Sequence, residues 1–164
     1  MIIVSACLCG INCKYNGGNN LDVRVLKLMQ EGKAIPVCPE QIGGMKTPRA
    51  PHEIVNGNGQ DVLMGKAKIL GREHDDDDDV TAEFIKGAYE TLKIAQAVSA
   101  SIAILKARSP SCGVSQIYDG TFSGTKRNGN GVTAQLLLSR GIKVYTEENL
   151  DELKLTKGEL RYEL

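Results

Sequence analysis

The sequence has no excess of either charge and no long apolar run, and each absence excludes a class of function. Its 20 Lys and Arg residues balance 20 Asp and Glu residues, so the formal net charge is zero. Proteins that hold long stretches of DNA or RNA need a basic surface against the phosphates, so we expect no long nucleic acid as a partner. No segment approaches the roughly 20 apolar residues that a membrane-spanning helix requires, so we expect no membrane partner either.

Histidine is scarce, and the glycines form no nucleotide-binding motif. The two histidines, His52 and His74, are too scattered for a histidine metal site, and neither has a serine or cysteine partner in a recognisable triad motif. The sequence contains no G-x-x-x-x-G-K-[ST] loop, and no G-x-G-x-x-G follows an expected strand. Hydrolysis by a triad and binding of nucleoside triphosphates or dinucleotides are therefore disfavoured.

The N-terminus indicates the compartment. Met1-Ile2-Ile3-Val4 runs directly into a strand-like segment with no basic region before it, which is unlike a secretory signal. We therefore expect a cytoplasmic protein. The cytosol keeps thiols reduced, so the five cysteines, an odd number, are better interpreted as thiols for metal binding or catalysis than as disulfides.

Short β-branched runs alternate with segments of helical periodicity along a chain whose 164 residues fit a single domain. The expected strands are 2–7, 34–38, 102–105 and 142–145, and the expected helices are 21–30, 80–98, 132–140 and a short last one within 147–153. This alternation predicts an α/β fold with one compact domain. A mainly parallel sheet of about four strands would be flanked by helices, Rossmann-like but without a dinucleotide motif.

The remaining segments are expected to be irregular apart from one small hairpin. The Asn-Gly-Asn-Gly stretch at 56–59 predicts a tight turn between strands at 53–55 and 61–64. Prolines and glycines make 39–51 an expected ordered loop rather than a helix. We interpret the acidic run at 75–79 as a solvated linker that caps the following helix, and 154–164 as a short C-terminal extension.

Three cysteines fall at corresponding places in this pattern. Cys7 ends the first expected strand, Cys38 ends the second, and Cys112 lies in the loop after the third. In an open parallel sheet the carboxyl ends of the strands share one edge, and sites form in the crevice there. We therefore expect three thiols that are far apart in the sequence to meet in one crevice.

Thiolates are soft ligands that suit iron–sulfur clusters, zinc or copper(I). Three cysteines on a cluster of four irons would leave one iron open, much as catalytic zinc keeps one position for substrate. The residues alone leave other arrangements open. Cys7-x-Cys9-x3-Cys13 would also make a compact local metal site, zinc included, and Cys13 would also serve as a fourth cluster ligand. Alternatively, Cys7 and Cys38 are simply small buried residues at strand ends.

A carboxylate, two hydroxyls and two cations are expected beside these cysteines. They are Glu40, Ser109, Ser111, Lys106 and Arg108. The glutamate follows the second cysteine in a segment pinned by prolines, so it either faces the crevice or is a solvated loop residue. The serines either border the third cysteine as functional hydroxyls or form turns, as loop serines usually do. The two cations would bind an anion or balance a negatively charged cluster.

Seven short blocks, in this order, resemble a known family. They are Ser5-Ala6-Cys7-Leu8-x-Gly10, Lys14-Tyr15-x-Gly17-Gly18, Pro36-Val37-Cys38-Pro39-Glu40, Thr47-Pro48-Arg49, Lys106-Ala107-Arg108-Ser109-Pro110-Ser111-Cys112-Gly113, Tyr118-Asp119-Gly120-Thr121-Phe122 and Gly131-Val132-Thr133-Ala134. Together they resemble the small bacterial family, long catalogued as a domain of unknown function, that includes the iron–sulfur thiouracil desulfidases. The resemblance runs from about residue 2 to 148.

The resemblance implies a [4Fe–4S] cluster held by three cysteines and a non-redox removal of sulfur from a small thiolated pyrimidine, as free base or nucleoside. The matching positions are Cys7, Cys38 and Cys112 for the cluster, and Glu40 and Ser109 for catalysis. Cys9 stands where family members usually carry an apolar residue, and Cys13 is variable among relatives, so these two cysteines are reserve ligands only. For a protein that carries such a cluster, we also expect a cluster-assembly donor as a partner and a monomer or small homo-oligomer. In protein prepared in air, we expect the cluster to be lost or replaced by zinc or a disulfide.

Two other functions compete with this one. The first is a metal or iron–sulfur carrier without turnover, for which neither Glu40 nor Ser109 would be needed. The second is a metal-free enzyme with a cysteine nucleophile, which the lack of a C-x-x-C motif disfavours.

Overall fold

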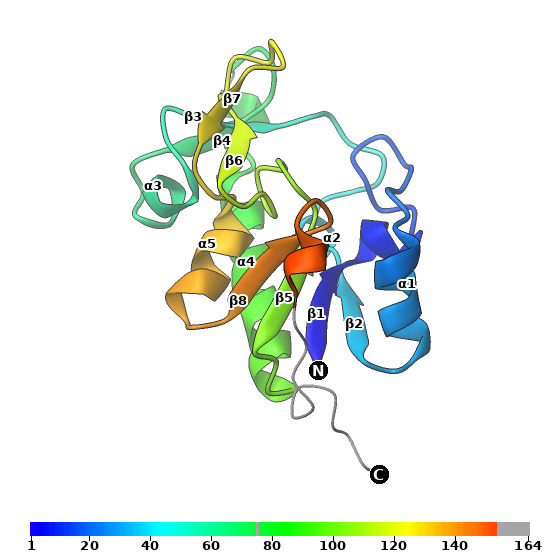
Figure 1. The fold of residues 1–164 in the computed structure, drawn as a ribbon. Coiled ribbons are helices and arrows are strands. Elements are labelled where there is room, and N and C mark those ends of the chain that lie inside the picture. The colour runs from blue at the N-terminus through cyan, green and yellow to red at the C-terminus, as the bar shows by residue number, and fades with distance from the viewer. Residues whose placement is uncertain (75, 154–164) are drawn as a thin grey trace.

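The computed structural model describes residues 1–74 and 76–153, and its centre is a parallel sheet (Figure 1). The four strands are β1 (Ile2–Ser5), β2 (Ala34–Val37), β5 (Ile102–Leu105) and β8 (Lys143–Thr146). They lie in the order β2-β1-β5-β8, and every neighbouring pair is parallel. The expected α/β fold with a four-stranded parallel sheet is therefore confirmed.

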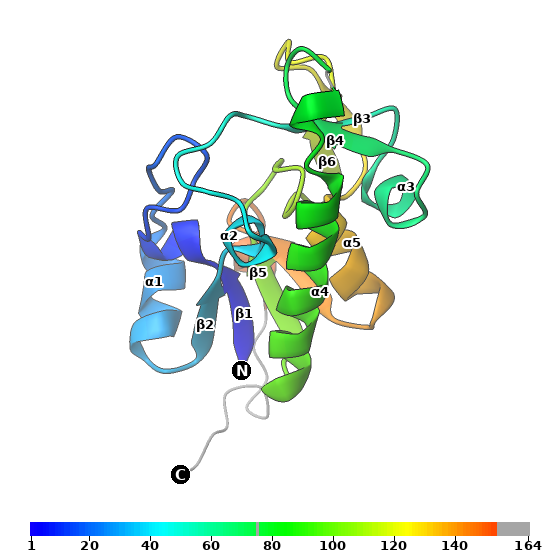
Figure 2. The same ribbon diagram turned by 180° about the vertical axis from the view of Figure 1, so that it is seen from behind.

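Helices cover both faces of this sheet, as Figures 1 and 2 show. α4 (Thr81–Ala97) and α5 (Val132–Ser139) pack on one face, in the same apolar cluster as Ile3 of β1. α1 (Val23–Gln30) packs on the other face with Ile2 and Val4, and so does the short 3-10 helix η3 (Leu150–Glu152). Because both faces are buried, the two central strands, β1 and β5, are apolar at every position except Ser5, which explains the apolar run at the N-terminus.

The expectation of a loop at 39–51 is wrong for its first five residues. They form α2 (Pro39–Gly43), which begins directly after β2 and packs against α4. Pro39 occupies the first turn, where its missing N–H breaks no hydrogen bond and its fixed φ suits a helix. Gly44 then ends the helix in the left-handed conformation.

The expected pairing of 53–55 with 61–64 is also wrong. β3 (Glu53–Val55) pairs antiparallel with β4 (Lys68–Leu70), and α3 (Gly59–Leu63) lies between them. Asn58 accepts hydrogen bonds from the backbone N–H groups of Gln60 and Asp61, and Asp61 accepts one from the backbone of Asn58. This reciprocal cap starts a helix where a tight turn was expected.

Two short strands and two 3-10 turns complete the elements of the described residues. β6 (Gln116–Tyr118) and β7 (Lys126–Asn128) form an antiparallel hairpin inside the long segment after β5. The first strand ends at Ser5, two residues earlier than expected, and a 3-10 turn, η1 (Ala6–Cys9), follows it.

The acidic run contains the 3-10 turn η2 (Asp76–Asp78), although residue 75 of that run is outside the described residues. Asp79 accepts a hydrogen bond from the backbone N–H of Thr81 at the start of α4. The expected extension at 154–164 also lies outside the described residues. Among the helices of the described part, none is long and apolar enough to span a membrane.

Candidate functional site

A cavity of about 640 Å³ opens at the carboxyl edge of the parallel sheet. Cys7 reaches it from η1 after β1, Cys38 from the junction of β2 with α2, and Cys112 from the loop after β5. Glu40 and Ser109 line the same cavity. The structure thus brings the three expected cluster ligands and the two expected catalytic residues to one place, because each follows the end of a parallel strand or lies close to it.

Cys13 lies between two of these thiols. Its thiol is 1% exposed and hydrogen-bonds to both Cys7 and Cys38. Hydrogen bonding from Cys13 lowers the pKa of Cys7, and it lowers the pKa of Cys38 to about 7. The same contacts raise the pKa of Cys13, because that thiol donates to its neighbours. In the absence of a metal, these hydrogen bonds therefore favour the thiolate forms of Cys7 and Cys38, with Cys13 as the proton donor.

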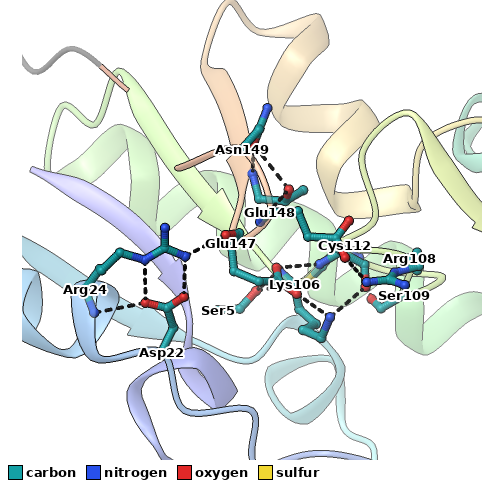
Figure 3. Close-up of polar contacts among 12 residues, drawn as sticks. Ser5, Asp22, Arg24, Lys106, Arg108, Ser109, Cys112, Glu147, Glu148 and Asn149 are labelled. Carbon is teal, nitrogen blue, oxygen red and sulfur yellow. Dashed lines mark hydrogen bonds and ion pairs between the residues drawn. The ribbon is translucent and has the colours of Figure 1, made fainter. Parts of the chain in front are cut away.

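Cys112 has a different environment. Burial raises the pKa of Cys112 to about 12, although Ser5 Oγ donates to its Sγ at 3.4 Å (Figure 3). Ser5 Oγ also accepts the backbone N–H of Lys106 at 2.9 Å, so one hydroxyl connects β1 to the loop after β5. A bound metal displaces the thiol proton, so this cysteine ionises when it acts as a ligand.

Cys9 is buried and does not line the cavity, and burial raises its pKa. Among residues 1–74 and 76–153, no three His, Cys, Asp or Glu side chains are grouped as the ligands of a single metal ion. The compact local site considered for Cys7, Cys9 and Cys13 is not formed in this part of the chain.

Glu40 is held by an arginine rather than solvated. Arg49 donates to Glu40 Oε2 through Nε at 2.8 Å and through a terminal guanidinium nitrogen, and their side chains are 7% and 15% exposed respectively. Arg49 also donates to the backbone carbonyl of Cys13 at 3.2 Å. No described residue donates to Glu40 Oε1, so this oxygen is the one left to meet a ligand. Arg49 belongs to the Thr47-Pro48-Arg49 block, but its pairing with Glu40 was not expected from the sequence.

The two serines of the third cysteine loop are placed differently. Ser109 Oγ accepts the backbone N–H of Cys112 at 2.8 Å and lines the cavity, so its own proton remains free to donate. Ser111 is 1% exposed, shares a hydrogen bond with the hydroxyl of Thr133, and does not line the cavity. Ser109 therefore combines a turn-forming role with access to a ligand, whereas Ser111 ties the loop to α5.

Lys106 and Arg108 line the cavity, but both are paired with acids that follow β8 (Figure 3). Lys106 Nζ pairs with Glu147, whose Oε2 also accepts the backbone N–H of Ala107 at 2.9 Å. Arg108 pairs with Glu148. The two acids follow β8, the edge strand of the sheet, and their contacts fix the segment that leads to Ser109. The acidic pair was missed in the sequence because it belongs to none of the quoted blocks.

Comparison with known proteins gives three matches to the chain. The sequence model of a family described as 2-thiouracil desulfurase matches residues 2–149. The uncharacterized protein YbbK of Bacillus subtilis (strain 168) is 48% identical over 153 residues, which cover 93% of this chain and 99% of that protein. The structure is similar to that of the [4Fe-4S]-dependent thiouracil desulfidase TudS (DUF523Vcz), with a TM-score of 0.80 and 38% identity over 93% of both chains.

Proposed function

Because the chain belongs to the 2-thiouracil desulfurase family, we propose that it is a [4Fe–4S]-dependent enzyme that removes sulfur from a small thiolated pyrimidine without net oxidation or reduction. The observation that carries this proposal is the single cavity lined by Cys7, Cys38, Cys112, Glu40 and Ser109. The reaction exchanges the thiocarbonyl sulfur for the oxygen of water and releases hydrogen sulfide, so its atoms and electrons balance without a redox partner.

The donor set fits an iron–sulfur cluster. Cys7, Cys38 and Cys112 supply three soft sulfur ligands from three different strand ends, and two of the three thiols already have a lowered pKa. A cluster held there by the three cysteines would supply a thiophilic Lewis acid for the sulfur of the substrate. Cys13 remains a reserve ligand because of its contacts with the other thiols, and Cys9 is less suited because it does not line the cavity.

Glu40 is the proposed general base and acid. Arg49 holds Oε2, so the carboxylate presents Oε1 to a water molecule and to a ring nitrogen of the substrate. The carboxylate removes a proton from the attacking water and returns it to the departing sulfur or to the ring nitrogen. Ser109 donates a hydrogen bond to the substrate, since its oxygen is already held by the backbone of Cys112. Arg49 is therefore a positioning residue for this step.

The cavity volume is compatible with more than one thiolated substrate. Its 640 Å³ lies within the usual range of small-molecule sites, roughly 300–1,000 Å³, and exceeds what a free base needs. We propose a free base such as 2-thiouracil or the corresponding nucleoside as the substrate. We further propose that the enzyme works in the cytoplasm as a monomer or small homo-oligomer and receives its cluster from an assembly donor.

The test is turnover by protein purified without air, with iron and sulfide counted for each preparation. Glu40→Gln keeps the volume of the side chain but removes the base. It is expected to retain the cluster absorbance and to release sulfide from 2-thiouracil about 100-fold more slowly. Glu31→Gln, at a surface glutamate, is the matched control and is expected to match the wild type. Cys7→Ala is expected to lose the iron.

Two outcomes would contradict the proposal in different ways. A wild-type rate of sulfide release by Glu40→Gln would remove the carboxylate from the mechanism. A cluster-loaded wild type that desulfurates no thiolated base or nucleoside would favour the carrier function, which needs neither Glu40 nor Ser109.

A further inference from the structure

A strained turn between β6 and β7 forms part of the cavity wall. Phe122, which lines the cavity, has φ of 56°, in the left-handed region where bulky residues are rare because Cβ crowds the backbone. The same turn contains Gly120 at φ of 92°, and a Cβ there would lie 2.7 Å from the carbonyl oxygen of Ile54. Such a conformation persists only where neighbouring contacts hold it, and such strain clusters at binding sites.

Glu53 of β3 supplies the contacts that hold this turn. Its side chain is buried, and Oε2 accepts the backbone N–H of Gly120 at 2.9 Å and that of Phe122 at 3.2 Å. Burying a carboxylate is unfavourable unless it is hydrogen-bonded, and these two donors satisfy Oε2. Glu53 thus holds the backbone of Phe122, although the two residues lie 69 positions apart in the sequence.

The ring of Phe122 is held by two groups from the segment after β4. The guanidinium carbon of Arg72 lies 5.4 Å from the ring centroid, within the range of a cation–π contact. The imidazole of His74 lies 5.9 Å away at an interplanar angle of 45°, and its Nε2–H donates to the carbonyl of Gly120 at 2.8 Å. The ring is therefore fixed and half-buried, with a surface that remains in the cavity.

The placement is notable in a chain with only two phenylalanines. Phe84 is 2% exposed and belongs to the apolar core, as expected for this residue type. Phe122 lies outside both core clusters, and the structure maintains a strained backbone, a buried carboxylate and two ring contacts to hold it at the cavity. Packing of the core does not explain this arrangement, whereas a flat ligand does.

We propose that Phe122 is the residue against which the pyrimidine ring of the substrate packs, and that Glu53 is the positioning residue that keeps it there. The proposal rests on the proposed function and names the determinant of its substrate class. Stacking on an aromatic side chain requires a flat ring but no particular hydrogen bonds. Phe122 therefore selects planar heteroaromatic compounds, while the thiols at the sheet edge would hold the cluster that supplies the Lewis acid for the departing sulfur.

The first measurement is binding without chemistry. Uracil and 5,6-dihydrouracil share their carbonyls and N–H groups, but only uracil is flat and aromatic. By titration calorimetry on the cluster-loaded protein, we expect uracil to bind about tenfold more tightly. The preference is expected to disappear in Phe122→Leu, which keeps an apolar side chain without a ring, and to persist in Phe122→Tyr.

The second measurement is turnover of 2-thiouracil. Phe122→Leu is expected to raise KM about tenfold and to change kcat much less, because the ring contributes to ground-state and transition-state binding alike. Glu53→Leu is expected to reproduce this rise, whereas Glu53→Gln keeps an oxygen acceptor and is expected to preserve KM. Glu53→Asp, which withdraws the carboxylate by one methylene, replaces Glu53→Leu if that variant does not fold. Lys126→Ala, exposed on β7, is the control.

The outcomes separate this proposal from the function on which it rests. Equal affinity of the wild type for uracil and 5,6-dihydrouracil, or unchanged binding and KM in Phe122→Leu, would overturn the role of Phe122. A rise in KM in Glu53→Gln equal to that in Glu53→Leu would overturn the positioning role of Glu53. A wild type that prefers uracil through Phe122 but releases no sulfide would refute the proposed desulfuration and leave a site for flat heterocycles.

Discussion

The thiols of the site differ in protonation because their hydrogen-bond partners differ. Cys13 donates to Cys7 and Cys38 and lowers the pKa of each, while burial raises the pKa of Cys112. A cysteine attacks electrophiles as the thiolate, so its rate of alkylation reports its own protonation. Cys38 is more exposed than Cys7, Cys13 and Cys112, and in the cluster-free protein its pKa is about 7.

We therefore predict that iodoacetamide modifies Cys38 of the cluster-free protein first, at a rate that rises with pH through about 7. The thiolate is the form above the pKa, so the rate falls as the pH is lowered. Cys13→Ala removes the hydrogen-bond donor, so the pKa of Cys38 rises and the rate at pH 7 falls. Peptide mapping at several pH values measures both effects.

Cys9→Ala is the control for this experiment, since Cys9 is not among the groups that shift the pKa of Cys38 and does not line the cavity. A profile of Cys38 that is the same in wild type and in Cys13→Ala would show that another group stabilises the thiolate.

Among the elements, α2 determines where two of the site residues lie. It begins directly after Cys38 and carries Glu40 in its first turn. Its position is fixed by close contact with α4, where glycines from the two helices meet. A Cβ on Gly43 would overlap the carbonyl of Glu83, and a Cβ on Gly87 would overlap the carbonyl of Pro39. Glycine is required there by the separation of the helices rather than by backbone conformation.

We predict that Gly87→Ala destabilises the protein by about 1–3 kcal/mol, the usual effect of overpacking, and lowers the iron content after reconstitution. The added methyl group pushes Pro39 away from α4, and Cys38 moves with it. Lys86→Ala, at the exposed neighbouring position, is the control and is expected to change neither quantity.

Urea unfolding followed by iron analysis gives both numbers for each variant. A Gly87→Ala protein that is as stable as the wild type and holds the same amount of iron would show that α2 adjusts to the contact.

At the scale of the whole molecule, the site joins the carboxyl ends of three strands that the sheet and the apolar core already hold side by side. The sheet is stabilised on its two faces by separate apolar clusters. The thiols that follow β1, β2 and β5 meet only at the cavity. A group bound to all three would therefore connect three strand ends, and it would bind the folded state alone.

We predict that removing the cluster with a chelator and an oxidant leaves the far-UV circular dichroism near that of the loaded protein and lowers Tm by about 5 °C or more. The sheet and helices persist because their core is independent of the site. In Cys7→Ala, which lacks a ligand, the same treatment is expected to leave Tm unchanged. Loss of the helical signal together with the cluster would show instead that the fold depends on it.

Local sequence patterns determined the central sheet and the approximate position of the site. Strands buried on both faces read as continuous apolar runs, and the cysteines that follow them meet because parallel strands end at one edge. The same local patterns predicted a loop where α2 forms and a tight turn where α3 begins. In the structure, Pro39 and Asn58 start these helices instead of ending regular structure. Whether such residues start a helix or a turn depends on what the following residues pack against.

Only the tertiary structure decided which side chains control the site. Arg49 reaches Glu40, Glu147 reaches Lys106 across 41 positions, and Glu53 reaches the turn that carries Phe122. Each of these charged residues would look solvated in the sequence, because periodicity reports the face of an element and not its long-range partner. Their partners follow from how the helices and hairpins pack around the edge of the sheet, which is a property of the folded chain.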